Sequence, residues 1–403
     1  MNGKRRTALL CAAGLLLVLA SCKKPGSPAE AKTQYYDTIL YQGFASGDGI
    51  YHQNSTGFLY FFDYRTRQDV IVCNKPNCTH SIWYENTPDE QRCNAYLPSA
   101  LGGAGFVAED FLYLFNVDLN TQTASLVRSG LDRTSEKEIA RFENNIISPF
   151  VVDGQYLYLS GCAILMQKDE DGMEQPTGEN EVWLFRVDLR TGEMKKLTER
   201  KKGYGSDLHL AGMYNGRLYY RESYFKTRYD GTNYKEAGHQ VDWYSFDIQT
   251  GQAERIFEGE QFQEAYLYKN KLAGMYGKDP EGGREAESRY GQYELTVWDL
   301  DTGESQPAGT ADRLPDYADG KVFYTAEEDG QERSYCYDIE NGKTMEQSRK
   351  FMERLHIRGA FGDYMLVVKD DPDTGIGDYY VILKEDFYNG KEQFVPITWD
   401  GET

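Results

Sequence analysis

The sequence predicts an all-β protein assembled from several copies of one strand-turn-strand unit. Tyr and Phe favour strands and Gly favours turns, and the 403-residue chain contains 32 Tyr, 19 Phe and 40 Gly. The repeated units show alternating hydrophobicity without helical periodicity. With 64 acidic against 44 basic residues, the formal net charge is −20, so the surface lacks the basic character that nucleic-acid binding needs.

The first half of the unit is a turn containing Gly, Asp or Asn, followed by an alternating aromatic strand. A clear copy is Asp153-Gly154-Gln155-Tyr156-Leu157-Tyr158, and another is Asn215-Gly216-Arg217-Leu218-Tyr219-Tyr220. Copies begin near residues 48, 109, 153, 214, 268, 319 and 362. A period of this length holds four short strands, which is the size of a propeller blade.

The second half of the unit is an apolar strand that runs into Asp-x-x-Thr-Gly or a relative. The copies span residues 188–192, 247–251 and 299–303, with a close relative at 338–342. Asp accepts backbone N–H bonds at the start of such a turn, and Gly supplies the positive φ that closes the hairpin. In the copy that begins at Asp63, Arg67 stands where the others have Gly.

These repeats predict a β-propeller of seven four-stranded blades, with six or eight blades as alternatives and a stacked β-solenoid as the competing fold. The predicted propeller domain spans 38–400, with blades at about 38–99, 100–145, 146–203, 204–260, 261–310, 311–353 and 354–400. The pattern resembles bacterial lipoproteins that have a propeller body with TolB-like or quinoprotein-like blades. The shared motifs mark hairpins, and the resemblance implies no activity.

The N-terminus has the anatomy of an export signal. Three cations, Lys4, Arg5 and Arg6, precede the apolar run 8–20, which is too short to span a membrane. The run ends in Leu19-Ala20-Ser21-Cys22, which resembles the lipoprotein box. That resemblance implies removal of residues 1–21, diacylation of Cys22, and a lipid-anchored protein on the extracytoplasmic side of the cell membrane. Residues 22–37 are predicted to be a flexible tether. The alternative is an ordinary export signal that happens to contain a cysteine.

One cluster of residues has metal-ligand spacing. Cys73, Cys78 and His80 are followed by Cys93, and three thiolates with one imidazole form a donor set that tetrahedral Zn²⁺ accepts. Pro76 and Asn77 suit the tight turn between the first two cysteines. The segment resembles a Cys-x4-Cys-x-His...Cys loop in the first blade of some propeller lipoproteins. A structural zinc clip is one interpretation, and a disulfide with one spare thiol is the other, favoured by an oxidising compartment.

Long insertions predict which face of the ring binds a ligand. They fall at residues 165–180, 224–240, 277–291 and 371–378, between second and third strands, and at 73–96, between the first two blades. All five should lie on one face, and such clustering is typical of a binding side. Within one insertion, Tyr224, Tyr229, Tyr234 and His239 are candidate ligand contacts, because aromatic faces suit sugars and peptides. These rings could instead pack the loop against its own blade.

The sequence contains no catalytic pattern. Its five His are spread over different units, and neither a nucleophile elbow nor a phosphate loop is present. The predicted function is therefore a non-catalytic binding or scaffold module for a protein, peptide or glycan. Two alternatives stay open. One is a surface enzyme acting on glycan or peptidoglycan at the propeller channel. The other is a metal- or redox-handling lipoprotein that uses the Cys/His loop.

Overall fold

Strands make up nearly all of the regular structure. The computed structural model describes residues 34–36, 43–84, 86–97, 105–118, 123–142, 145–228, 238–257, 262, 264–278, 284–285, 291–375 and 377–398. Its helical elements are short: η2 (Asp89–Gln91), α3 (Arg349–Met352) and α4 (Lys384–Tyr388). No helix within these ranges is long and apolar enough to cross a membrane. The predicted signal peptide and Cys22 lie outside the described residues.

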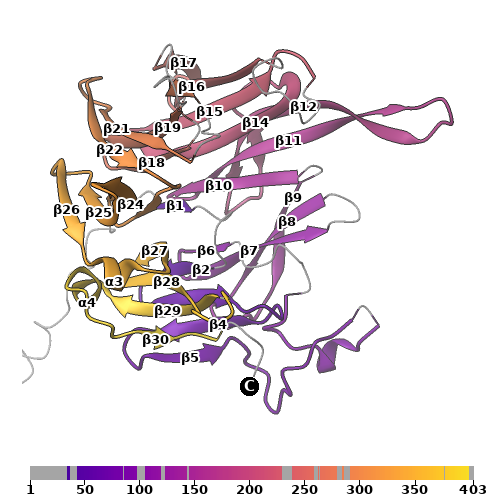
Figure 1. The fold of residues 1–403 in the computed structure, drawn as a ribbon. Helices are drawn as coiled ribbons and strands as arrows, with labels where there is room; N and C mark the ends of the chain where they lie inside the picture. Colours follow the sequence, from indigo (N-terminus) through magenta and orange to yellow (C-terminus); the bar gives the residue numbers. More distant parts are fainter. Residues whose placement is uncertain are drawn as a thin grey trace, which may run out of the picture.

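Six sheets are present in the described part of the chain, and four of them are antiparallel meanders of four consecutive strands (Figure 1). The first two are β2 (Gly43–Ser46), β3 (Gly49–Gln53), β4 (Leu59–Asp63), β5 (Gln68–Ile71), and β6 (Gly105–Ala108), β7 (Phe111–Asp118), β8 (Thr123–Ser129), β9 (Lys137–Phe142). The last two are β23 (Asp316–Ala318), β24 (Lys321–Glu328), β25 (Gln331–Asp338), β26 (Lys343–Gln347), and β27 (Leu355–Phe361), β28 (Tyr364–Asp370), β29 (Gly377–Leu383), β30 (Val395–Pro396). The all-β prediction is confirmed.

The two remaining sheets are larger. One orders β18 (Glu264–Tyr268), β19 (Lys271–Lys278), β21 (Tyr293–Asp299) and β22 (Ser305–Ala311), with β20 (Arg284–Glu285) added to β19. The nine-stranded sheet contains two meanders, β10 (Asn145–Asp153), β11 (Tyr156–Lys168), β12 (Glu174–Asp188), β13 (Met194–Lys196), and β14 (Lys201–Tyr214), β15 (Arg217–Phe225), β16 (His239–Asp247), β17 (Gln252–Ile256). These two meanders join because residues 179–182 of β12 pair with residues 201–204 of β14.

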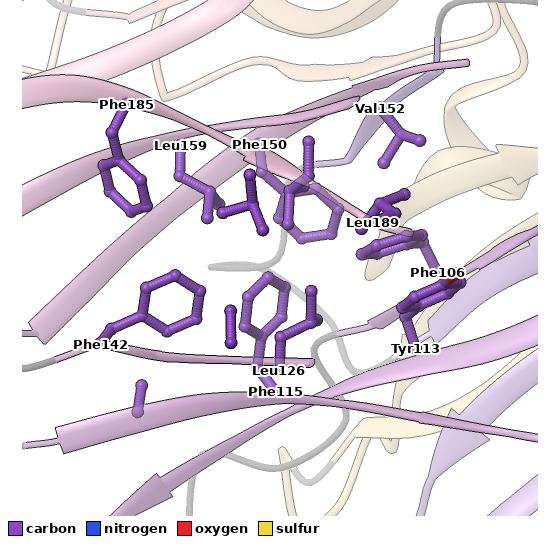
Figure 2. Packing of buried hydrophobic residues seen from close by; sticks show 14 of the residues in the cluster. Phe106, Tyr113, Phe115, Leu126, Phe142, Phe150, Val152, Leu159, Phe185 and Leu189 are labelled. Atoms are coloured by element: carbon purple, nitrogen blue, oxygen red, sulfur yellow. The ribbon is translucent and has the colours of Figure 1, made fainter. Parts of the chain in front are cut away.

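Neighbouring meanders pack face to face through clusters of buried apolar side chains. Figure 2 shows the cluster between β6–β9 and β10–β13. There the ring centroid of Phe150 lies 5.5 Å from that of Phe106 and 5.3 Å from that of Phe115. Burying one such side chain contributes roughly 1.5–3 kcal/mol. Comparable clusters lie at each of the other junctions, so the apolar strand faces predicted from the repeats form the core.

The Asp-x-x-Thr-Gly turns have the predicted chemistry. Oδ1 of Asp188 accepts the backbone N–H groups of Arg190 at 2.9 Å and Thr191 at 3.1 Å. Gly192 closes the turn at φ 78°. The residue after each Asp is apolar and packs into the cluster between two meanders, as Leu189 does. The turn therefore shapes the hairpin and also fastens it to its neighbour.

The first and last meanders close the ring without sharing a strand in the described part of the chain. Ile50 and Phe62 pack against Tyr364 and Leu366 in one buried cluster. The backbone N–H of Thr398, after the last strand, donates to Oδ2 of Asp69 in β5 at 2.7 Å. Side-chain packing and this terminal hydrogen bond therefore join the two ends.

A short strand lies inside the predicted tether. Residues 22–37 were expected to be flexible throughout, but β1 (Gln34–Tyr36) pairs antiparallel with β10. β10 is the first strand of its meander, so β1 extends that sheet beyond its inner edge. The open backbone edge of β10 supplies hydrogen-bond partners that composition alone does not reveal.

The two faces of the ring differ in their connections. Because the strands alternate in direction, the turns joining first to second and third to fourth strands lie on one side, called here the short-turn face. The other connections form the loop-rich face. In the described part of the chain it carries residues 72–97 after β5, the β11–β12 hairpin and residues 371–375 between β28 and β29. The predicted insertions at 224–240 and 277–291 lie partly outside the described residues. The β11–β12 hairpin projects far from the body on this side (Figure 1).

Candidate metal centre

Four potential metal ligands converge in the connection after β5. The ligand atoms of Cys73, Cys78, His80 and Cys93 all lie within 4.8 Å of one another. Cys73 lies two residues after β5, the outermost strand of the first meander, and Cys93 lies two residues after η2. The sequence-predicted set is therefore brought together in space. All five cysteines of the described part, including Cys162 and Cys336, are free thiols.

The spacing of these atoms fits a tetrahedral zinc shell. Zn–S bonds of about 2.3 Å and Zn–N bonds of about 2.0–2.1 Å place sulfur pairs about 3.8 Å apart and a sulfur–nitrogen pair about 3.6 Å apart. Sγ of Cys93 and Nδ1 of His80 are 3.5 Å apart. Three sulfurs and one imidazole nitrogen are also the donors that structural zinc sites use. This pair and the donor set fit the ion, and the other ligand atoms lie within 4.8 Å of one another, close enough to converge on one ion.

The surroundings favour ionisation at one thiol and oppose it at another. Burial acts to raise the pKa of Cys73. Hydrogen bonds from the backbone N–H groups of Lys75 and Asn94 and from the thiols of Cys78 and Cys93 together outweigh it, so the pKa lies below its ordinary value. Burial raises the pKa of Cys93 to about 12, and the nearby Cys73 and Cys78 add to the shift. A cation bound between the sulfurs would offset this mutual repulsion.

The backbone of the loop is bent to bring the ligands together. Asn77 and His80 adopt left-handed φ values of 58° and 49°, which non-glycine residues rarely take. The N–H of Cys78 donates to the carbonyl of Lys75 at 3.3 Å, which closes the tight turn predicted around Pro76. The local strain is concentrated at a ligand and at its turn.

Polar contacts hold the rest of the loop in place. Nζ of Lys75 donates to the carbonyl oxygens of Asp89 and Arg92, both at 2.7 Å. The Trp83 indole N–H donates to the carbonyl of Cys93 at 3.0 Å, and the Arg92 guanidinium lies 4.9 Å from the centroid of the Trp83 ring. The segment thus has its own small framework around the four ligands.

The Cys/His loop also connects the first two meanders. It forms a small buried cluster against β4 together with Phe58 and Tyr60. Towards the second meander, Nε of Arg133 donates to the carbonyl of Asn94 at 3.2 Å, and Asn74 donates to Asp132 at 3.3 Å. The candidate metal centre therefore lies in a loop that contacts both of the first two meanders.

The candidate aromatic contacts are only partly described. Tyr229 and Tyr234 lie outside the described residues. Tyr224 is the half-buried penultimate residue of β15, and the ring of His239 lies 4.9 Å from that of Phe225 across the β15–β16 pair. Burial and the nearby Arg221 lower the pKa of His239 to about 4. His239 therefore has a packed ring that stays neutral at physiological pH.

A polar group around Arg221 was not predicted from the sequence. Arg221 is 9% exposed, and its Nη1 donates to Asp207 at 3.1 Å and Ser223 at 3.0 Å. Its Nε atom is buried without a partner in the described structure. His209 lies directly opposite on β14, where burial and Arg221 lower the pKa of this histidine to about 3. The sequence did carry a signal, because strand alternation places Arg221 on the same face as the buried Tyr219.

Comparison with known proteins identifies the architecture alone. No protein-family model matches the sequence, and no curated protein matches it. Among solved structures, the acylaminoacyl peptidase of Pyrococcus horikoshii is similar, with 14% identity, a TM-score of 0.52, and coverage of 89% of this chain and 52% of that one. This chain therefore spans about half the length of that peptidase.

A second solved structure matches over nearly its whole length. The β-propeller domain of the Trilobed protease from Pyrococcus furiosus is 13% identical, with a TM-score of 0.51 and coverage of 90% of this chain and 98% of that one. That domain is described as having an open velcro topology. At such low identity the likeness extends to the fold, and this chain is a β-propeller.

Proposed function

We propose that this chain is a lipid-anchored, extracytoplasmic, seven-bladed propeller that acts as a non-catalytic binding module through its loop-rich face. The observation that carries the proposal is the concentration of unique segments on one side of an otherwise regular ring. One of those segments contains the four-donor Cys/His centre. Segments that depart from a repeat on one face are where repeat proteins usually bind their partners.

The blade number of seven follows from counting meanders and not sheets. The nine-stranded sheet contributes two blades, β10–β13 and β14–β17. One buried cluster lies at each junction between consecutive meanders, including the junction of the last with the first. A closed ring needs as many junctions as blades, and this requirement supports the count.

The Cys/His centre is proposed to hold structural zinc. Cys73, Cys78, His80 and Cys93 fill the four positions of a tetrahedral ion, whereas catalytic zinc keeps one position open. The ion would cross-link the two ends of the loop that follows β5 and so hold it on the first two blades. This assignment disfavours the redox and metal-delivery alternative, because a filled shell leaves no site for exchange.

A surface enzyme acting on glycan is the second candidate, and one observation favours it. Arg221 keeps a buried Nε without a described partner close to Asp207 and His209. A buried cation with a free donor suits an anionic group on a ligand. Tyr219 and Trp243, on the same strand face as Arg221, belong to the apolar cluster between the β14–β17 meander and the β18–β22 sheet, and this packed setting favours binding over catalysis.

Photo-crosslinking in cells of the native host tests the proposal. A crosslinking amino acid would replace Tyr84, which is 71% exposed, or Glu170 at the β11–β12 tip. Gln249, in a short turn, is the matched control. Discrete adducts from the first two positions and none from Gln249 are expected. Turnover of a glycan by the purified protein, with no adduct from the loop-rich face, would overturn the proposal in favour of the enzyme.

Mass spectrometry of the N-terminal peptide tests diacylation of Cys22 separately.

A further inference from the structure

We propose that the short-turn face of the ring lies against the membrane and that the loop-rich face points away from it. This inference rests on the proposed lipidation of Cys22. It uses a feature that the proposed function does not, namely the direction in which β1 runs. A lipid anchor fixes distance from the bilayer, whereas orientation depends on where the chain leaves the body.

The register of β1 gives its direction. Gln34 pairs with Val152 and Tyr36 pairs with Phe150, so β1 runs antiparallel to β10. β10 ends at Asp153, where the tight turn into β11 begins and Asp153 pairs with Tyr156. That turn joins a first strand to a second strand and therefore lies on the short-turn face.

The N-terminal end of β1 is consequently at the short-turn face. Gln34 lies opposite the residue that precedes the turn, and the chain then moves away from that face towards Tyr36. The next described strand, β2, begins at Gly43 and runs towards its own turn with β3 on the same short-turn face. β1 thus starts at the short-turn side and runs along the edge of β10 away from that side, and β2 runs back towards it.

The length of chain before β1 restricts where the lipid can be. Eleven residues separate Cys22 from Gln34. Fully extended they reach about 40 Å, and as a flexible coil about 20 Å. The nine residues of β10 span roughly 30 Å from one face to the other. A relaxed tether therefore reaches a membrane beside the short-turn face, whereas a membrane beside the loop-rich face would require a nearly extended tether around the rim.

The charges next to the anchor support the same orientation. Lys23 and Lys24 follow Cys22 directly, and such cations are attracted to anionic headgroups. The whole chain carries a formal net charge of −20, so the body has no general attraction to the same surface. The anchor segment, and not a basic patch on the ring, then sets the approach to the bilayer.

Energy transfer to the membrane tests the orientation. The lipidated full-length protein would be reconstituted in vesicles of phosphatidylcholine and phosphatidylglycerol that contain an acceptor-labelled lipid. A donor dye would be attached through a bioorthogonal amino acid at Gln249, in a short turn, or at Glu170, at the tip of the β11–β12 hairpin. Both positions are exposed, so the labelled proteins should fold alike. Faces roughly 30 Å apart should differ severalfold in transfer efficiency, with Gln249 the higher.

Two further variants separate the possible failures. Cys22→Ser should abolish transfer from both dyes, and if it does not, the anchoring proposal itself fails. Tyr35→Pro and Tyr36→Pro are tested separately, because alternate residues of an edge strand donate to the ladder and at least one change removes a donor. That change should reduce the contrast between the dyes. Equal transfer from the two dyes in the lipidated protein, higher transfer from Glu170, or an unchanged contrast in both proline variants would overturn the orientation.

Discussion

The short-turn face and the loop-rich face of this ring are built on different principles. Five of the turns between third and fourth strands repeat one local device, in which an Asp carboxylate accepts backbone N–H groups and a residue of positive φ closes the hairpin. On the loop-rich face the same device recurs only in two tight hairpin ends of the described chain, at Asp169 and Asp371. Its long connections each have their own sequence, and one of them assembles a Cys/His centre. The repeated face thus accounts for the ring, and the irregular face is where this chain differs from a generic propeller.

The largest expected effect is loss of the metal from the loop-rich face. Protein purified without added metal should contain about one zinc per chain, and Cys78→Ser should remove it. The variant should lose on the order of 4 kcal/mol of stability in this region, because the binding energy of structural zinc is folding energy. Elemental analysis and thermal unfolding measure both effects. Cys336→Ala removes a buried thiol elsewhere and should keep the zinc. Zinc-free protein with a disulfide among Cys73, Cys78 and Cys93 would contradict the assignment.

The next largest effect is a loss of folding stability in acid, caused by a buried histidine on the β14–β15 pair. The pKa of His209 is about 3 in the folded protein against an ordinary 6.5, so the unfolded chain binds more protons between these values. Stability should therefore fall as pH drops below 6.5, by up to about 1.4 kcal/mol per pH unit from this group. Denaturant titrations of His209→Gln should show a shallower pH dependence. His356→Gln changes a 38% exposed ring beside Asp370 and is the control. An unchanged slope in His209→Gln would show that this histidine does not titrate as described.

The third effect compares the two ends of a single strand, β25. Oδ1 of Asp338, at the short-turn end, accepts the N–H of Asn341 at 2.9 Å. Burial opposes ionisation, but this hydrogen bond and the charge of Lys321 hold the pKa of Asp338 below its ordinary value. Asp338→Ala should cost about 1 kcal/mol at neutral pH, and the difference from the parent protein should shrink as pH falls through that lowered pKa. Glu332→Ala, at the exposed opposite end, should be nearly neutral. Equal losses would argue against a special role for the turn.

The smallest effect is a gain in stability. Arg67 occupies the position of the closing Gly in the first blade and adopts φ 55°. An L-residue is strained there, so Arg67→Gly should stabilise the protein by roughly 0.5–1 kcal/mol. Arg65→Gly removes the same charge two residues earlier, where φ is not positive, and should destabilise instead. Chemical denaturation of the two variants gives the comparison, and a loss in Arg67→Gly would show that its side chain outweighs the strain.

The sequence was most informative where structure depends on neighbouring residues. The turns around Asp188 and the cluster that starts at Cys73 were predicted because their partners lie within a few residues or share a recognisable spacing. β1 was missed because its partner, β10, is more than a hundred residues away and the tether has no apolar pattern. The Arg221 group was missed because its members are ordinary strand residues that only register brings together. Long-range pairing is what local patterns do not encode.

The pairing of β12 with β14 has a mechanical consequence. Residues 179–182 and 201–204 link two consecutive blades by backbone hydrogen bonds, whereas the sheets of the other described blades are separate and meet through side chains. Small relative motions of the blades should therefore occur at the interfaces that side chains alone form. Apolar contacts loosen gradually, whereas a hydrogen-bonded ladder opens cooperatively. Under mechanical force or during unfolding, these two blades should move as one body. The interface between the first and last blades, where the two chain ends meet, is where the ring should open.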